Sequence, residues 1–315
     1  MTKLPIVLDK SNIKEFLDRF DTILTDCDGV IWNGHNVIDK ANETIKTFKN
    51  LGKRVIYVTN NCTLTREVML KKLEKLDFPG AKEDIATPAY TVAQYLKDLN
   101  FDKKAYVLGL EGIIHELDDV GIPHSTIGPD VIKNELYEVG PAVQEELDSD
   151  VGAVVVGFDF HFSFPKIIKA STYINSNPSC LFLALAGDEN FQDPKTNLTW
   201  PCTGALVKCI STVVEKEPIL IGKPATKMYD IMEKHFKFDP NRTLMIGDRG
   251  NTDILFGKNC GLTTLLVLSG VTQLSDCEAW AASKDPEAHR LLADYYLPSL
   301  GALRNLLQVA NGCSL

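Results

Sequence analysis

Two aspartates one residue apart are the residues of this chain best suited to chemistry. Asp26 and Asp28 follow the run Ile23-Leu24-Thr25, and Gly29 comes directly after them. Such a run predicts a short buried strand, and a glycine marks the turn at its end. Two carboxylates held together in a cleft repel each other unless a cation or a shared proton relieves them. The same pair also fits a polar turn of solvated aspartates, so the other polar loops must decide between these interpretations.

Further polar residues lie at or near the ends of other expected strands. Thr59 ends the expected strand over 54–59, and Asn60 follows it. Lys223 lies in a Gly-Lys-Pro segment, and Asp248 follows the expected strand over 243–247, with Asp253 five residues further on. In open parallel sheets, ligands bind at the carboxyl ends of the strands. We therefore expect these loops to share one site.

This set of side chains suits phosphoryl transfer. Carboxylates bind Mg²⁺, which prefers oxygen ligands and bridges to phosphate. A hydroxyl group and an ammonium group suit the remaining phosphate oxygens. A carboxylate can also act as a nucleophile and take up the phosphoryl group, and most of the catalysis then comes from positioning and positive charge.

The elements that position these residues alternate between strand and helix. Continuous apolar strands separated by helices predict an α/β fold with a Rossmann-like parallel-sheet core. From about Phe101 the pattern restarts, which predicts a second α/β unit. We expect strands over 22–25, 54–59, 105–109, 153–157, 180–184, 243–247 and 264–268, helices over 12–20, 39–51, 65–76, 90–99, 111–120, 164–175 and 204–215, and a final edge strand and helix within 295–308.

Composition excludes several classes of protein. The 315 residues are 44% hydrophobic and 24% charged, with a net charge of −9. An acidic chain gains nothing from counterion release, so we expect no nucleic-acid partner. No apolar run reaches the length of a membrane span, and Met1–Lys10 lacks the apolar stretch of a signal peptide. We therefore expect a cytoplasmic protein whose eight cysteines are reduced and, without a Cys-x-x-Cys pair, bind no structural zinc.

Taken in order, the motifs resemble those of the haloacid dehalogenase superfamily of phosphatases. More narrowly, they resemble those of the group that contains p-nitrophenylphosphatase, phosphoglycolate phosphatase and pyridoxal phosphatase. The matching segments are Asp26-Cys27-Asp28-Gly29-Val30-Ile31-Trp32, Val58-Thr59-Asn60-Asn61, Val155-Val156-Gly157-Phe158-Asp159, Ile221-Gly222-Lys223-Pro224, Met245-Ile246-Gly247-Asp248-Arg249 and Thr252-Asp253-Ile254.

The resemblance implies a phosphoric monoester hydrolase that works through an aspartyl-phosphate. Asp26 would be the nucleophile, and Asp28 would protonate the leaving oxygen and then activate water. Mg²⁺ would be held by Asp26, the backbone carbonyl of Asp28, and Asp248, with support from Asp253. Thr59, Asn60 and Lys223 would bind the substrate phosphate.

The resemblance also implies two domains. Residues 1–100 and 203–315 would form the hydrolase core, and residues 101–202 an inserted α/β cap that selects the substrate. In some relatives the cap also pairs two subunits, and the sequence leaves open whether this chain forms such a homodimer. Where relatives have Thr-Asn-x-Asp in the cap, this chain has Leu185-Ala186-Gly187-Asp188. We therefore expect fewer hydrogen bonds to the leaving group and a broad phosphatase, with phosphoglycolate ahead of pyridoxal phosphate.

Three alternatives accompany this interpretation. The chain would be a pyridoxal phosphate phosphatase if the cap selects that ester, or a catalytically silent phosphate-binding protein if the acid–base residue is inactive. The presence of Asp28 favours the enzyme. A phosphotransferase or protein phosphatase is a weaker option, because the cap would obstruct a folded protein substrate. Trp32 is expected to pack against the cap, and Cys27 is a candidate for oxidation.

Overall fold

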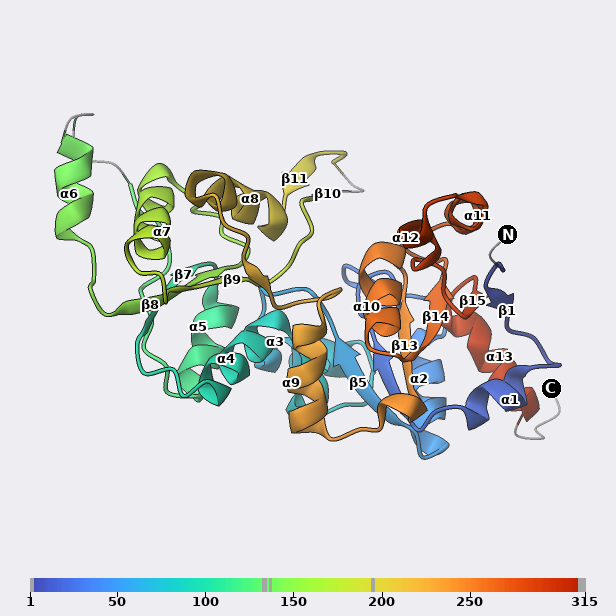
Figure 1. The fold of residues 1–315 in the computed structure, drawn as a ribbon. Helices are drawn as coiled ribbons and strands as arrows, with labels where there is room; N and C mark the ends of the chain where they lie inside the picture. The colour runs from blue at the N-terminus through green and yellow to red at the C-terminus, as the bar shows by residue number, and fades with distance from the viewer. Residues whose placement is uncertain (1–2, 132–134, 136–137, 194–195, 311–315) are drawn as a thin grey trace. The chain divides into compact units, whose positions relative to one another are not determined.

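The computed structural model describes residues 3–131, 135, 138–193 and 196–310. The chain divides into two compact units (Figure 1). Unit 1 comprises Met1–Thr59, Arg66–Ala86 and Lys223–Leu315, and unit 2 comprises Asn60–Thr65 and Thr87–Gly222. The division falls at Thr87 and Gly222 rather than near residues 101 and 202, because the helices over 88–98 and 203–214 belong to unit 2.

Unit 1 is built on a seven-stranded parallel sheet. Its order is β1 (Ile6–Val7), β15 (Tyr295–Leu297), β14 (Thr263–Val267), β13 (Thr243–Gly247), β2 (Thr22–Thr25), β5 (Arg54–Val58) and β6 (Ile85–Ala86). Strands β13, β2 and β5, which predicted site residues follow directly, lie next to one another in this sheet. The expected parallel α/β fold is confirmed. The predicted edge position of the last strand is wrong, because β1 from the N-terminal segment pairs with its outer side.

Helices bury the apolar side chains of this sheet. One core cluster joins Ile23 and Val55 of the strands to Phe16, Phe48 and Leu303 of three helices that pack together. The helices of unit 1 are α1 (Ile13–Asp18), α2 (Ala41–Asn50), α3 (Arg66–Lys75), α9 (Thr226–Phe236), α10 (Leu255–Asn259), α11 (Leu274–Ala282), α12 (Pro286–His289) and α13 (Leu300–Ala310), with short helical turns over Lys82–Asp84, Pro240–Arg242 and Gly250–Ile254 and a small hairpin of β3 (Trp32–Asn33) and β4 (Asn36–Val37).

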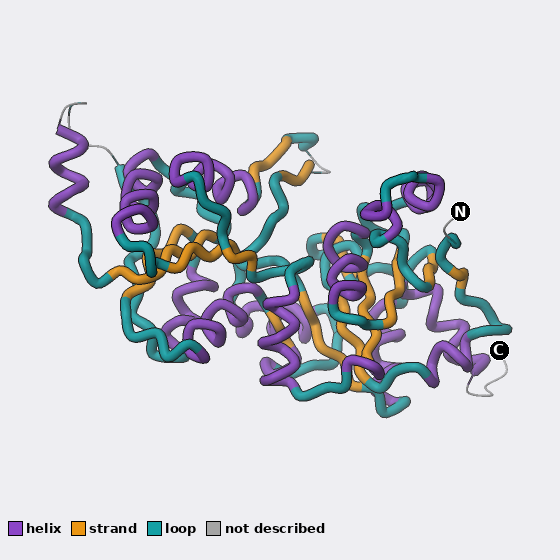
Figure 2. Tube along the Cα trace, in the orientation of Figure 1, coloured by secondary structure: helices purple, strands orange, loops and turns teal. Residues whose placement is uncertain are grey.

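Unit 2 has a smaller parallel sheet between two pairs of helices. Its strand order is β12 (Ile219–Leu220), β9 (Leu181–Ala184), β8 (Val151–Val156) and β7 (Lys104–Leu108). Successive strand residues point to opposite faces, so Val107 packs with helices α4 (Pro88–Asp98) and α5 (Glu111–Asp119), and Leu108 with α7 (Phe164–Ser176) and α8 (Thr203–Val214). Helices flank the strands on both sides (Figure 2). Helix α6 (Val139–Glu145) and the hairpin of β10 (Asn190–Gln192) and β11 (Thr199–Pro201) complete the unit.

Two sequence-based expectations for unit 2 need correction. Leu185 and Ala186 are buried, and Leu185 belongs to the apolar core beside Ile221. Their side chains therefore fill the interior of unit 2, and they give no ground for expecting a less selective enzyme. The strand before Lys223, β12, pairs with β9 in the sheet of unit 2 and is not part of the sheet of unit 1.

Candidate active site

The site is centred on the carboxyl ends of adjacent strands β13 and β2. Asp26 follows β2, and its N–H continues the sheet by donating to the carbonyl of Ile246 at 2.9 Å. Asp248 follows β13, which pairs in parallel with β2. Both strands are buried throughout and end at the same edge of the sheet. The two carboxylates therefore lie at one place, although their segments are more than two hundred residues apart. Asp253, in the helical turn Gly250–Ile254, lies beside them.

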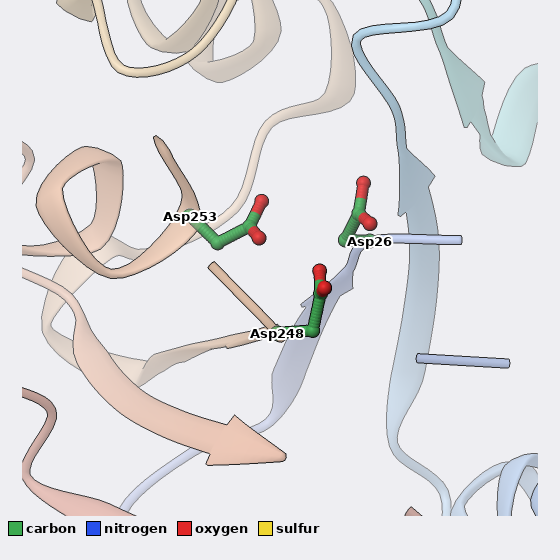
Figure 3. Close-up of side chains that lie close together, drawn as sticks. All are labelled: Asp26, Asp248 and Asp253. Carbon is green, nitrogen blue, oxygen red and sulfur yellow. The ribbon is translucent and has the colours of Figure 1, made fainter. Parts of the chain in front are cut away.

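The three carboxylates form one buried group. Oxygen atoms of Asp26, Asp248 and Asp253 all lie within 4.8 Å of one another, and all three residues are buried. Figure 3 shows their side chains close together, with Asp26 at the end of its strand. Three acidic groups so placed repel one another strongly unless positive charge lies among them.

Lys223 supplies part of that charge. Its side chain is 1% exposed, and its Nζ donates to Asp26 Oδ1 at 2.7 Å, to Asp253 Oδ1 at 2.7 Å and to the carbonyl of Val58 at 2.8 Å. Burial alone would lower the pKa of Lys223, but the charges of Asp253 and Asp26 and their hydrogen bonds outweigh it and raise that pKa. The lysine is therefore held charged.

Close backbone approach fixes Asp248. The N–H of Val271 donates to its Oδ2 at 2.8 Å. A Cβ on Gly270 would lie 1.9 Å from the same oxygen, and a Cβ on Gly29 would lie 2.6 Å from it. Gly29 also has a φ of +86°, which L side chains rarely adopt. Glycine is thus required on two sides of this carboxylate, and Gly270 is a contributor that the sequence analysis missed although it lies just beyond strand β14.

Burial and mutual repulsion raise the pKa values of two of the three carboxylates. Burial raises the pKa of Asp26 well above its usual range, and the charges of Asp253 and Asp248 act in the same direction against the ammonium of Lys223. Burial, together with the charge of Asp253, raises the pKa of Asp248 to about 6. One ammonium therefore does not neutralise the group.

This charge imbalance fits a divalent cation. Carboxylate oxygens are hard ligands of the kind that Mg²⁺ prefers, and the three buried carboxylates retain excess negative charge beside Lys223. The site residues present therefore fit the expected metal.

The carboxylate of Asp28 has a different environment. Asp28 is exposed, and it accepts a hydrogen bond from the indole Nε1 of Trp32 at 3.0 Å. Partial desolvation raises its pKa, while the charge of Lys72 and the hydrogen bond from Trp32 act in the opposite direction. A raised carboxyl pKa suits a residue that must donate a proton.

The two remaining predicted phosphate ligands belong to different units. Thr59 is buried in unit 1 directly after β5, and its N–H donates to the carbonyl of Ala86 at 3.2 Å. Asn60 belongs to unit 2, where its amide donates to Asp188 at 3.3 Å. Of the predicted site residues, Asp26, Lys223, Asp248 and Asp253 thus form one contact group.

Two expectations about neighbouring residues are wrong. Cys27 is fully buried, and burial raises the pKa of its thiol well above its usual range, so the reactive thiolate is disfavoured. Trp32, which was expected to face the cap, is instead buried in the core of unit 1, where its ring meets that of Phe78. Several cysteines are free thiols, namely Cys27, Cys62, Cys180, Cys209, Cys260 and Cys277.

Comparison with known proteins places this geometry in a family. A model described as haloacid dehalogenase-like hydrolase matches residues 23–123, and a second, described as HAD-hydrolase-like, matches residues 220–295. Phosphoglycolate phosphatase 1A, chloroplastic, of Arabidopsis thaliana is 40% identical over 90% of this chain and 76% of its own length. Glycerol-3-phosphate phosphatase of Gallus gallus is 38% identical over 96% of each.

A solved structure shows the same fold. The p-nitrophenyl phosphatase from Archaeoglobus fulgidus superposes with a TM-score of 0.76, at 24% identity, over 91% of this chain and 98% of that one. The chain belongs to the haloacid dehalogenase-like hydrolases. Within them it belongs to the phosphatases, which are phosphoric monoester hydrolases. The predicted family, fold and enzyme class are confirmed.

Proposed function

We propose that this protein is a Mg²⁺-dependent phosphatase that hydrolyses small phosphate monoesters through an aspartyl-phosphate on Asp26. The observation that carries the proposal is the buried group of Asp26, Asp248 and Asp253 around the ammonium of Lys223. A nucleophilic carboxylate set beside positive charge is the arrangement that phosphoryl transfer requires.

Each side chain has one task in this proposal. An oxygen of Asp26 forms a bond to phosphorus as the bond to the leaving oxygen breaks, and Asp28 gives its proton to that oxygen. Water then attacks the phosphorus of the aspartyl-phosphate and gives a proton to Asp28, while the bond from phosphorus to the Asp26 oxygen breaks. This step releases inorganic phosphate and restores the Asp26 carboxylate. Lys223 stabilises the negative charge on the transferred group, and Thr59 and Asn60 contribute polar groups to phosphate binding.

Asp26, Asp248 and the backbone carbonyl of Asp28 would hold Mg²⁺, with Asp253 in support. When bound, the cation supplies positive charge for the phosphoryl oxygens and relieves the repulsion among the carboxylates. Asp253 also fixes the loop of Asp248, because its Oδ2 accepts from the N–H of Arg249 at 3.1 Å.

The substrate class follows from the relatives. One is named for phosphoglycolate and another for glycerol 3-phosphate, both short-chain esters. We propose such esters as substrates of this chain, with phosphoglycolate ahead of pyridoxal phosphate. Glycerol 3-phosphate, which the sequence analysis did not consider, joins them on the strength of the comparison.

The roles of the two units, the partners and the location remain predictions. Unit 1 would be the hydrolase core, and unit 2 the cap that selects substrates and pairs subunits. The described helices include none with the length and apolarity to cross a lipid bilayer. A cytoplasmic location and the lack of a nucleic-acid partner stay expectations from sequence.

The experiment that tests the function is a hydrolysis panel with Mg²⁺. Phosphoglycolate, glycerol 3-phosphate, pyridoxal phosphate and p-nitrophenyl phosphate are compared by kcat/KM, and mass spectrometry of quenched enzyme identifies a phosphorylated aspartate. Phosphate release from short-chain esters, with the phosphoryl group on Asp26, supports the proposal. Binding of phosphate without turnover of any ester would instead establish the silent phosphate-binding alternative.

A further inference from the structure

Trp32 holds the carboxylate of Asp28 through a hydrogen bond that its backbone reinforces. The indole Nε1 donates to Asp28 Oδ1 at 3.0 Å. In the same turn, the N–H of Gly29 donates to the carbonyl of Trp32 at 2.8 Å, and the N–H of Trp32 donates to the carbonyl of Cys27 at 3.2 Å. The hydrogen bond from the indole to Asp28 therefore forms within a turn that backbone hydrogen bonds also stabilise.

The indole ring is itself immobilised. Trp32 is fully buried, and its ring meets that of Phe78 edge to face at 5.8 Å between centroids. The Nζ of Lys72, on helix α3, lies 4.0 Å from the ring centroid. A cation over the ring face attracts the π electrons and thereby makes the indole N–H a better donor. The direction and the strength of the hydrogen bond to Asp28 are both set by this packing.

A donor of this kind distinguishes the two oxygens of Asp28. An indole N–H donates and never accepts, so it pairs with an oxygen that carries no proton at that position. The carbonyl oxygen of a protonated carboxyl is its better acceptor, so this hydrogen bond to Oδ1 favours the form of Asp28 that has its proton on Oδ2. General acid catalysis needs the proton on the oxygen that faces the leaving group, and a misplaced donor loses much of its effect.

We propose that Trp32 is a positioning residue that fixes the Asp28 carboxyl so that Oδ2 delivers the proton to the leaving oxygen, and that Lys72 holds the indole in place. This inference rests on the proposed function. In the step concerned, the phosphorus–leaving oxygen bond breaks, the bond from Asp26 to phosphorus forms, and the proton of Asp28 passes to the leaving oxygen, which leaves Asp28 as a carboxylate.

The test is the dependence of kcat/KM on the leaving group. This parameter reports steps up to release of the leaving group, and alkyl esters need protonation far more than p-nitrophenyl phosphate does. For Trp32→Phe, which keeps a ring and removes the N–H, we expect kcat/KM to fall about 30- to 100-fold with glycerol 3-phosphate and less than about 5-fold with p-nitrophenyl phosphate. Asp28→Asn should show the same selectivity more strongly.

A shape-matched variant separates the hydrogen bond from packing. Benzothienylalanine at position 32 replaces the N–H with sulfur in a bicyclic ring of nearly the same size, and it should reproduce the selective loss. Trp280→Phe makes the same change elsewhere in unit 1 and should leave the ratio of the two substrates unchanged. Lys72→Met should give a smaller selective loss than Trp32→Phe, and Lys71→Met, on the exposed neighbouring residue, none.

The outcomes are distinct. A selective loss with alkyl esters in both position-32 variants supports the inference. An equal loss with all substrates, or none, overturns it, because a structural role alone would not discriminate between leaving groups. If the wild-type enzyme hydrolyses none of the esters, the proposed function itself has failed, and that result appears before any variant is compared.

Discussion

Replacing Lys223 with methionine tests how strongly its buried ammonium neutralises the surrounding carboxylates. Two carboxylate oxygens lie 2.7 Å from Nζ. At an effective dielectric constant near 20, each contact is worth about 6 kcal/mol of Coulomb attraction before the cost of desolvation. Removing one partner of a buried ion pair destabilises a protein by about 3–5 kcal/mol. We expect a loss of this size in EDTA, seen as a melting temperature lower by roughly 6–15 °C.

The assay is thermal unfolding in EDTA and in Mg²⁺, with a matched buried pair as control. The cation should restore much of the stability of Lys223→Met, because it supplies the missing positive charge. Lys166 pairs with Asp159 at 2.6 Å in unit 2, and both side chains are buried. Lys166→Met should therefore lose comparable stability without recovery in Mg²⁺. An undiminished melting temperature for Lys223→Met in EDTA, or equal recovery of both variants, would refute the electrostatic reasoning.

Four further predictions concern the acidic group. Asp26→Asn removes the attacking charge and should reduce turnover of p-nitrophenyl phosphate to background while the circular dichroism spectrum is kept; substantial activity would exclude Asp26 as the nucleophile. EDTA should abolish turnover, Mg²⁺ should restore it and Ca²⁺ should inhibit, so full activity in metal-free buffer would contradict the role of Asp248. The pKa of Asp248, raised from 3.8 to about 6, corresponds to a contribution of about 3 kcal/mol that is present below pH 4 and lost as the pH rises through 6. In EDTA this group should therefore destabilise the protein from pH 4 to pH 7, and the rise in melting temperature on adding Mg²⁺ should grow over the same range; a constant rise would disprove the shift. Gly270→Ala places a methyl group 1.9 Å from Asp248 Oδ2 and should weaken Mg²⁺ binding at least tenfold, as measured by activity at increasing Mg²⁺ concentrations. Gly261→Ala is the control: its Cβ position has open space around it, so this variant should lose stability but keep its affinity for Mg²⁺.

Much of the site was predictable because the strands that end at it are rich in apolar and β-branched residues. The expected strand over 22–25 is observed at those residues, and Asp26 and Asp248 follow two strands that pair side by side. Alternation of apolar strands and helices fixes a parallel sheet, and in such a sheet the strand ends meet at one edge. For these residues, the strand pattern along the chain and the pairing of the strands in the sheet place the side chains at the same edge.

The sequence-based predictions that were wrong have a common physical cause. The pattern of side chains along the chain indicates that a residue is buried, but not against which partner. Leu185 was therefore assigned to the substrate pocket although it packs in the core of unit 2, and Trp32 to the cap although it packs on Phe78. Helix α9 (Thr226–Phe236) was missed, although Met228 and Met232 give it an apolar face.

The discontinuity of unit 1 has a consequence for synthesis of the chain. Strand β2 lies between β5 and β13, and β5 follows it within about thirty residues, whereas β13 emerges only after the whole of unit 2 has been made. At roughly 5–20 residues per second, one edge of β2 waits on the order of tens of seconds for its second neighbour. Throughout that interval the nascent chain presents an unpaired apolar strand, which is a template for aggregation. Asp26 also lacks Lys223 and Asp248 in that interval, so the predicted site is incomplete until both residues have been added.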